Sequence, residues 1–152
     1  MMKRIALTFM LAVIGPLLHA AAVQTQKSIK INQAQKLEVN FLSYLPEDYN
    51  KKKDAKWPVI LFLHGAGERG NDLNRVKVHG PPMLAEKGKK FPFIIVSPQC
   101  PKGQVWDAEV LLALLDHVCA KYRVDKTRQY LTGLSMGGYG TWSLGITHCD
   151  RF

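Results

Sequence analysis

Runs of hydrophobic residues divide this chain into segments that predict a sheet covered by helices. Residues 37–44 alternate with a period of two, which is typical of a strand with one buried face. Residues 58–63 and 93–96 are instead continuously apolar, and residues 129–132 form a third, shorter segment of this kind that ends at a glycine. Apolar runs without alternation predict strands buried on both faces, as in a parallel sheet under helices.

Helical spacing of apolar residues appears between the second and third of these runs. Residues 107–122 carry apolar side chains three and four positions apart, with Asp107 placed to cap the first turn and Arg123 closing the last. Residues 82–90 are expected to form a shorter helix. Strands that alternate with helices predict an α/β fold with right-handed crossovers, and no repeat or linker divides the chain after its N-terminal segment.

The N-terminal segment has the pattern of an export signal. A basic start, an apolar middle over 5–18 and an A-x-A ending at Ala22 identify residues 1–22 as a signal peptide cleaved near Ala22. The alternative is a buried helix or a membrane anchor, but Pro16 and the shortness of the run argue against it, since a spanning helix needs roughly 18 apolar residues or more. The mature protein is therefore expected to be secreted or periplasmic, with no stable membrane anchor. Residues 23–36 are expected to be a polar lead-in.

Composition and charge limit the function classes. The chain has 152 residues, 47% hydrophobic and 22% charged, which excludes a disordered, collagenous or coiled-coil protein. Basic residues exceed acidic ones by 21 to 12, and they cluster at 51–53 and 87–90. Neither cluster is accompanied by aromatic residues or a recognition helix, so these are expected to be solvated loops and no nucleic-acid partner is predicted.

Cysteine and histidine spacing gives no metal site. The chain has three cysteines, so at least one is unpaired within it. None is part of a CxxC motif and no cluster of cysteine and histidine suggests zinc, so neither a metal nor another cofactor is predicted. Cys119 is expected on a helix face, and the state of Cys100 and Cys149 is left open.

A candidate nucleophile lies in the motif Gly133-Leu134-Ser135-Met136-Gly137. This G-x-S-x-G pattern follows an apolar strand and precedes residues 138–146, which are expected to be helical. A serine on a sharp strand-to-helix turn has strained dihedrals that expose its hydroxyl, and side chains at the flanking glycines would collide across the turn. The helix that starts beneath the hydroxyl also favours negative charge there. The alternative is a glycine-rich turn with a buried serine.

A second glycine-rich loop, residues 64–70, follows the first buried strand. In a turn of this kind one backbone amide of the loop and the amide after the nucleophile, here Met136, bind the oxyanion. We place the loop amide at Ala66, with Gly67 as the next choice. His64 is expected to hold the turn. A pairing of Glu68 with Arg69 to hold the loop is also expected, and the alternative for the whole segment is a flexible turn.

Three segments, residues 61–70, 97–101 and 130–138, together resemble the α/β-hydrolase superfamily. Within it the chain looks like secreted esterases and predicted peptidases of the polyhydroxybutyrate-depolymerase, feruloyl-esterase and phospholipase/carboxylesterase type. The resemblance implies that residues 37–152 are the N-terminal part of a three-layer α/β/α domain with a mostly parallel sheet. It also implies a serine hydrolase that cleaves small-molecule or polymeric carboxylic esters through an acyl-enzyme on Ser135.

The residues that would activate the serine are missing. In α/β-hydrolases the serine is followed by the acid and then by the histidine, but only His148 and Asp150 follow Ser135 here. A helix would separate Ser135 from His148 by about 20 Å, far more than the ~3 Å of a hydrogen bond. We therefore expect a fragment that ends after the nucleophile helix and is inactive alone. The alternatives are a prolyl-oligopeptidase-like peptidase and a non-catalytic hydrolase remnant or binding protein.

Two further histidines and two aromatic residues are the remaining candidates for a role in the site. His79 and His117 show no sign of acting as the base. Trp106 and Tyr139 either line a substrate groove or are packing residues.

Overall fold

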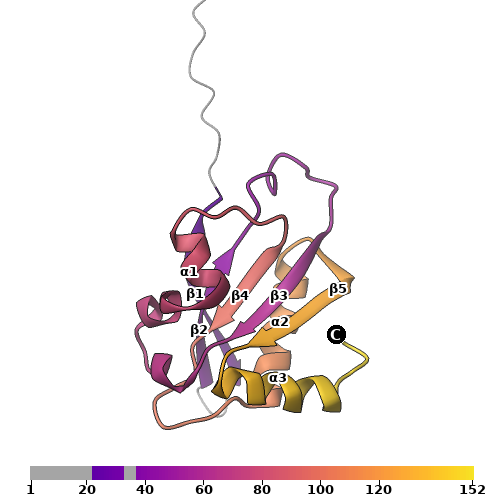
Figure 1. Ribbon diagram of the computed structural model, residues 1–152. Coiled ribbons are helices and arrows are strands. Elements are labelled where there is room, and N and C mark those ends of the chain that lie inside the picture. The colour runs from indigo at the N-terminus through magenta and orange to yellow at the C-terminus, as the bar shows by residue number, and fades with distance from the viewer. Residues whose placement is uncertain (1–21, 33–36) are drawn as a thin grey trace, which may run out of the picture.

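The computed structural model describes residues 22–32 and 37–152, so the predicted signal peptide, apart from its last residue, lies outside the described residues. Five strands form one sheet in the order β1-β2-β4-β3-β5. In chain order the strands are β1 (Gln24–Asn32), β2 (Leu37–Tyr44), β3 (Trp57–Leu63), β4 (Ile94–Pro98) and β5 (Val124–Gly133). Figure 1 shows β5 at one edge of the sheet, with the chain passing from it into the last helix.

The sheet is mixed. Strand β3 pairs in parallel with β4 and with β5, and these three strands are the ones that the apolar runs predicted. Strand β2 pairs antiparallel with both β1 and β4. Most of the expected polar lead-in over residues 23–36 forms a strand, because β1 pairs with β2 from Gln24 to Asn32. Because its side chains are mostly polar, no apolar pattern predicts this edge strand, which backbone hydrogen bonds to β2 stabilise.

The described residues also form three α-helices and two short 3-10 helices, which connect the strands except for α3, which follows the last one. They are η1 (Ala66–Glu68), η2 (Leu73–Val78), α1 (Gly80–Glu86), α2 (Ala108–Lys121) and α3 (Met136–Thr147). The predicted helix over 107–122 is confirmed as α2, and the carboxylate of Asp107 accepts a hydrogen bond from the amide of Val110 at 3.0 Å. Helix α1 starts and ends earlier than the predicted 82–90, with Gly88 at φ 84° just beyond its end.

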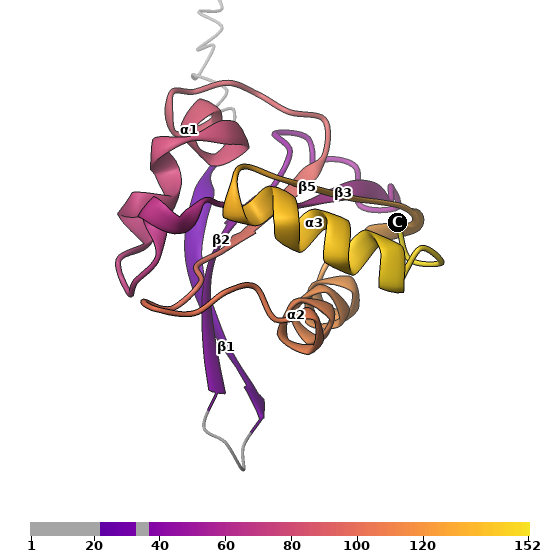
Figure 2. The same cartoon turned by 60° about the horizontal axis from the view of Figure 1, so that its bottom comes forward.

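Helices cover both faces of the sheet, and α1 and α2 lie on opposite sides of it (Figure 2). The main core lies where α2 and α3 meet the strands; the helix residues buried in it are Leu111, Leu114, Leu115, Val118 and Leu144. A smaller cluster of Leu42, Leu73 and Val76 lies under η2. This three-layer arrangement agrees with the predicted fold class. Within residues 22–32 and 37–152, no helix combines the length and apolarity that crossing a bilayer requires.

Candidate active site

Ser135 occupies a strained turn between β5 and α3. Its backbone has φ 53° and ψ −116°, and among the described residues it is the only non-glycine residue with positive φ. Residues other than glycine rarely adopt this backbone conformation, which costs about 1–3 kcal/mol and persists only where the surrounding structure holds it. The side chain is exposed at the start of α3. The structure thus has the tight strand-to-helix turn that the motif predicted, and the alternative of a buried serine in a glycine-rich turn is wrong.

The two glycines of the motif are required by backbone contacts. A Cβ added to Gly133 would lie 2.2 Å from the carbonyl oxygen of Gly137, and one added to Gly137 would lie 1.9 Å from that of Leu63. Real Cβ atoms do not approach so closely, so the turn can form only with glycine at both positions. The predicted steric reason for these glycines is confirmed.

The loop after β3 lies directly against this turn. A Cβ placed on Gly65 would be 3.6 Å from Cβ of Ser135 and 3.6 Å from the carbonyl oxygen of Leu134. No described residue accepts a hydrogen bond from the amide of Ala66 or from that of Met136, the first residues of η1 and α3. The structure therefore brings the predicted nucleophile and the loop with the predicted oxyanion amides together, with free donors on both sides.

Side chains hold four successive carbonyl groups of this loop. An amide N–H points away from the carbonyl of its own planar peptide, so holding a carbonyl also orients the next N–H. The bonds are His64 Nδ1 to Gly65 O (2.6 Å), Arg69 Nε to Ala66 O (3.0 Å), Arg75 Nη2 to Gly67 O (2.5 Å) and Gln99 Nε2 to Glu68 O (2.8 Å). The amides from Ala66 to Arg69 are thus fixed in direction before any substrate binds, which is the preorganisation that oxyanion binding requires.

His64 has the structural role that was expected of it. Its side chain is 1% exposed, and Nε2 accepts a hydrogen bond from the amide of Cys100 at 3.0 Å. Nδ1 therefore carries the proton and donates it to Gly65. Burial lowers the pKa of His64 below its ordinary value, so the ring stays neutral. The indole Nε1 of Trp106 donates to the carbonyl of His64 at 3.2 Å, with the rings 4.8 Å apart.

The segment after β4 anchors the loop, and sequence reasoning did not assign it this role. Gln99, 5% exposed, donates from Nε2 to the carbonyls of Glu68 and Asp72 at 2.8 and 2.9 Å. The amide of Gly70 donates to the carbonyl of Cys100 at 3.0 Å. The available signals were the apolar strand leading into Gln99 and the resemblance of residues 97–101 to the superfamily, and neither indicates a partner 31 residues away.

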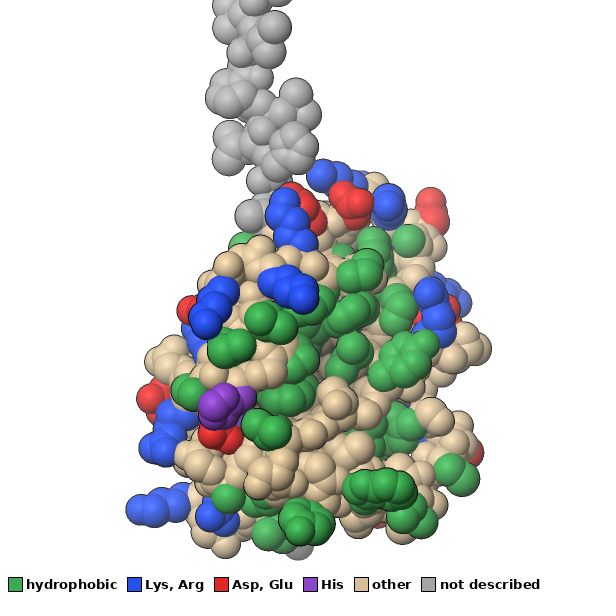
Figure 3. Space-filling view, in the orientation of Figure 1, with side chains coloured by type: hydrophobic (Ala, Val, Ile, Leu, Met, Phe, Trp, Pro, Cys, Tyr) green, Lys and Arg blue, Asp and Glu red, His purple; other side chains and the backbone are tan. Residues whose placement is uncertain are grey.

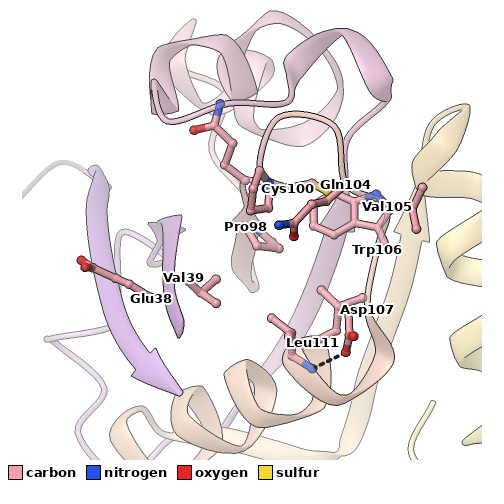
Figure 4. A pocket seen from close by; sticks show the side chains of 12 residues that line it. Glu38, Val39, Pro98, Cys100, Gln104, Val105, Trp106, Asp107 and Leu111 are labelled. Carbon is pink, nitrogen blue, oxygen red and sulfur yellow. Dashed lines mark hydrogen bonds between the residues drawn. The ribbon is translucent and has the colours of Figure 1, made fainter. Parts of the chain in front are cut away.

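Behind the loop, Cys100 and Trp106 line a small apolar cavity of about 40 Å³ between β2, β4 and α2 (Figure 4). Burial raises the pKa of the Cys100 thiol, which keeps it protonated and unreactive. Trp106 is a packing residue here. Tyr139, by contrast, is 81% exposed. All three cysteines are free in this structure.

The expected pair of Glu68 with Arg69 does not form. The Glu68 carboxylate instead lies 3.8 Å from Nε2 of His79 and 3.9 Å from Nδ1 of His64. Arg69 points the other way and donates to the carbonyls of Ala66 and Gln104. An exposed ion pair contributes little to stability, so nothing holds Glu68 and Arg69 together once the loop turns their side chains apart.

No base stands next to the serine within the part of the chain that the structure describes. The Ser135 hydroxyl has no hydrogen-bond partner there, and His148 lies at the opposite end of α3, where Nδ1 is 2.8 Å from the Thr147 hydroxyl. The position expected for His148 is thus confirmed. His117 on α2 has a buried Nε2 without a partner, and burial lowers its pKa. The same residues contain no group of three or more side chains arranged to hold a metal ion.

The mixed sheet, the turn at Ser135 and the loop against it constitute the α/β-hydrolase fold, and the solved structures that this chain resembles include two esterases and a peptidase. A thermostable esterase superposes with a TM-score of 0.69 at 27% identity, over 85% of this chain and 39% of the esterase. A ferulic acid esterase superposes with a TM-score of 0.68 at 22% identity, over 87% of this chain and 57% of that esterase. The acylaminoacyl peptidase of Pyrococcus horikoshii superposes with a TM-score of 0.57 at 22% identity, over 87% of this chain and 22% of the peptidase. The chain thus spans less than two thirds of each. No protein-family model matches it.

Proposed function

We propose that this chain is the nucleophile-bearing part of a serine hydrolase that cleaves carboxylic esters through an acyl-enzyme on Ser135. The observation that carries the proposal is the positive φ of Ser135, 53°, at the end of a parallel strand and against the loop of Gly65. Such strain persists where it exposes a reactive group. The similarity to esterases, one of them at 27% identity, favours esters over amides.

In the proposed reaction the Ser135 hydroxyl attacks the ester carbonyl and its proton passes to a base. The carbonyl oxygen becomes an oxyanion, which the amides of Met136 and Ala66 bind, with Gly67 as the alternative loop donor. Each such donor contributes on the order of 3 kcal/mol to the transition state. The alcohol then leaves with a proton from the same base, and water hydrolyses the acyl-enzyme to release the acid and restore the hydroxyl.

The base and its acid partner are proposed to come from polypeptide outside these 152 residues. Strand β5 pairs only with β3 among the described residues, and large apolar side chains on β5, the turn and α3 are exposed. They are Tyr130, Leu134, Tyr139, Trp142 and Ile146. An uncovered apolar face beside an unpaired strand edge is suited to a further strand and helix. The same polypeptide would bring a histidine to Ser135.

A fluorophosphonate probe tests the nucleophile. It should label the protein expressed from its own complete reading frame, with the modified residue mapped to Ser135 by mass spectrometry, and Ser135→Ala should abolish the labelling. The 152-residue chain alone should show no Ser135-dependent hydrolysis of p-nitrophenyl acetate. Absence of labelling in the complete protein would favour the second candidate, a non-catalytic remnant that keeps the fold, for which the missing base is the supporting observation.

Two further experiments address the bond cleaved and the location. Esters should be hydrolysed faster than the matched anilides, and the reverse order would favour a peptidase, the activity named for the Pyrococcus horikoshii neighbour. Export is proposed from the pattern of residues 1–22. N-terminal sequencing of the protein from the culture medium or periplasm should begin at Val23, and a mature protein that begins at Met1 would contradict it.

A further inference from the structure

On the outer side of the loop after β3, away from Glu68, lies a basic hollow of about 380 Å³. We define this basic hollow by its charged side chains, Arg69, Arg75, Lys102 and Asp72, and by the backbone of Ala66 and Gly67 that forms its wall. The cations come from three places: the loop itself, η2 and the connection between β4 and α2.

The three cations of the hollow lack an ionic partner among the described residues. Within those ranges, no carboxylate lies within 4 Å of Arg69, Arg75 or Lys102. Other basic side chains, such as Lys53, Lys87 and Lys89, also lack an ion pair there, so these three cations stand out because they share one hollow. The one acid of the hollow is committed elsewhere, since Oδ1 of Asp72 accepts from the amide and the side chain of Asn74. The hollow therefore has an excess of positive charge.

The two arginines are also held in place. Arg69 uses Nε and Nη1 on the carbonyls of Ala66 and Gln104, and Arg75 uses Nη2 on the carbonyl of Gly67. This leaves Nη2 of Arg69 and both Nε and Nη1 of Arg75 without a bonded acceptor among the described residues. Donors whose carriers are already ordered lose less entropy when a ligand binds. An anionic oxygen group is the ligand that such a set of donors fits.

We propose that the basic hollow binds an anionic oxygen group, a carboxylate or a phosphate, carried by the ester substrate. The arginines of the hollow hold the carbonyls of Ala66 and Gly67, whose peptides carry the N–H groups of Gly67 and Glu68 on their opposite side. The hollow and the proposed oxyanion donors therefore lie on the two sides of one loop, and a bound anion would be separated from the scissile carbonyl by the width of that loop. In this respect the inference rests on the proposed function. It deepens it by naming the substrate class: esters that carry a negative charge at a distance from the reacting carbon, so that the charge can reach the outer side of the loop.

Binding of small anions to the 152-residue chain tests the hollow without any catalysis. In a heteronuclear NMR titration, succinate or inorganic phosphate should shift the amides of Gly67, Gly70 and Asn71, and the shifts should weaken as salt rises. Succinamide, which has the shape of succinate without its charge, should leave them in place. Whichever of succinate and phosphate binds more tightly shows whether the hollow is a carboxylate site or a phosphate site. Equal shifts with succinamide, or none with either anion, would overturn the proposal.

Variants distinguish binding in the hollow from general attraction of anions to a basic protein. Lys102→Gln and Arg75→Gln should each weaken anion binding at least about tenfold, because each removes a charge-assisted contact of about 1.4 kcal/mol or more. Lys102 is exposed and contributes to no core, so its variant should stay folded by circular dichroism. The matched control is Lys126→Gln, an exposed lysine beside Asp116 and Asp150, which should leave binding unchanged. Loss of binding in this control as well would show general charge attraction and would reject the hollow.

Failure of this inference and of the proposed function are distinguishable. Ser135→Ala should abolish fluorophosphonate labelling of the complete protein and leave anion binding intact. If the complete protein is not labelled but the anion still binds, the nucleophile is wrong and the hollow stands. If labelling occurs but charged and neutral esters are hydrolysed equally well, the hollow does not select the substrate and the inference fails.

Discussion

His64 and Cys100 are 36 residues apart in the chain, yet the amide of Cys100 donates a 3.0 Å hydrogen bond to Nε2 of His64. The bond joins the loop after β3 to the segment after β4, and both connections start at the carboxyl ends of these two parallel strands. It leaves the proton of the neutral ring on Nδ1, which donates to Gly65. One buried side chain thus satisfies two backbone groups and fixes the peptide that carries the proposed Ala66 donor.

The first prediction concerns acid stability. Burial lowers the pKa of His64 below 6.5, so the unfolded chain binds a proton that the folded chain does not. Stability from this group is complete above about pH 6.5 and should fall, by at most about 1.4 kcal/mol per pH unit, as the pH drops from there. Urea unfolding at several pH values measures the slope. His64→Phe should reduce it, and an unchanged slope would contradict the assignment.

His117→Gln is the matched control for this measurement. Burial lowers the pKa of His117 in the same direction, so its removal should also reduce the slope. It should not, however, disturb the loop, because His117 lies on α2. His64→Phe should in addition lower the free energy of unfolding at pH 8 by about 2–4 kcal/mol, since the Cys100 amide and the Gly65 carbonyl both lose their partner.

The second prediction uses two glycines of α3 that differ only in their surroundings. Gly137→Ala places a Cβ 1.9 Å from the carbonyl oxygen of Leu63, and we expect a loss of at least about 3 kcal/mol, or no folded protein. Gly145→Ala meets nothing within 4 Å and should stabilise the chain by about 0.5–1 kcal/mol through helix propensity. Thermal and urea unfolding compare the two. Similar stabilities would show that α3 does not pack against the end of β3.

How far the sequence predicts this molecule depends on whether the signal is local. The parallel strands and α2 are predictable because apolar runs and helical spacing lie within a few residues. The turn at Ser135 is predictable for the same reason, since its glycines stand two residues on each side. Strand β1 was missed because its residues are mostly polar, and what holds it is its pairing with β2, which no pattern within residues 24–32 indicates.

The contacts that hold the candidate site are long-range, and this is why sequence reasoning missed them. Gln99 is bonded to carbonyls 31 and 27 residues earlier, and although residues 97–101 belong to a recognisable segment, nothing in them indicates these partners. The expected pairing of Glu68 and Arg69 was wrong for a related reason. Adjacent opposite charges suggest an ion pair, but the loop turns the two side chains to different sides, toward His79 and toward the carbonyl of Ala66.

The third prediction follows from Gln99. Gln99→Leu keeps the approximate volume but removes the donors to Glu68 and Asp72, so the free energy of unfolding should fall by about 2–3 kcal/mol. Hydrogen exchange of amides 66–72 should accelerate by more than this global loss explains, because the loop loses its anchor. The matched control is Gln104→Leu, an exposed position whose side chain makes no hydrogen bond within the described chain. Uniform acceleration over the whole chain would argue against a specific role for Gln99.

The last prediction concerns the exposed face of α3. Tyr139, Trp142 and Ile146 are 81%, 72% and 67% exposed and lie on one side of the helix, at spacings of three and four residues. Hydrophobic side chains over α3 are visible at the bottom of Figure 3. Apolar residues in this pattern are those of a buried helix, so the 152-residue chain should self-associate through them.

The double variant Trp142→Lys/Ile146→Lys should make the chain monomeric in sedimentation velocity. Measured at concentrations low enough for the parent chain to be monomeric too, its free energy of unfolding should differ by no more than about 0.5 kcal/mol, because neither side chain is packed in the monomer. Val105→Lys, at a position 70% exposed but on a different surface, should leave the association as it is. In the complete protein the same double variant should destabilise by several kcal/mol, since it would bury two charges under the covering polypeptide. If it were equally neutral there, α3 would be a free surface in the complete protein, and the base for Ser135 would have to arrive from another side.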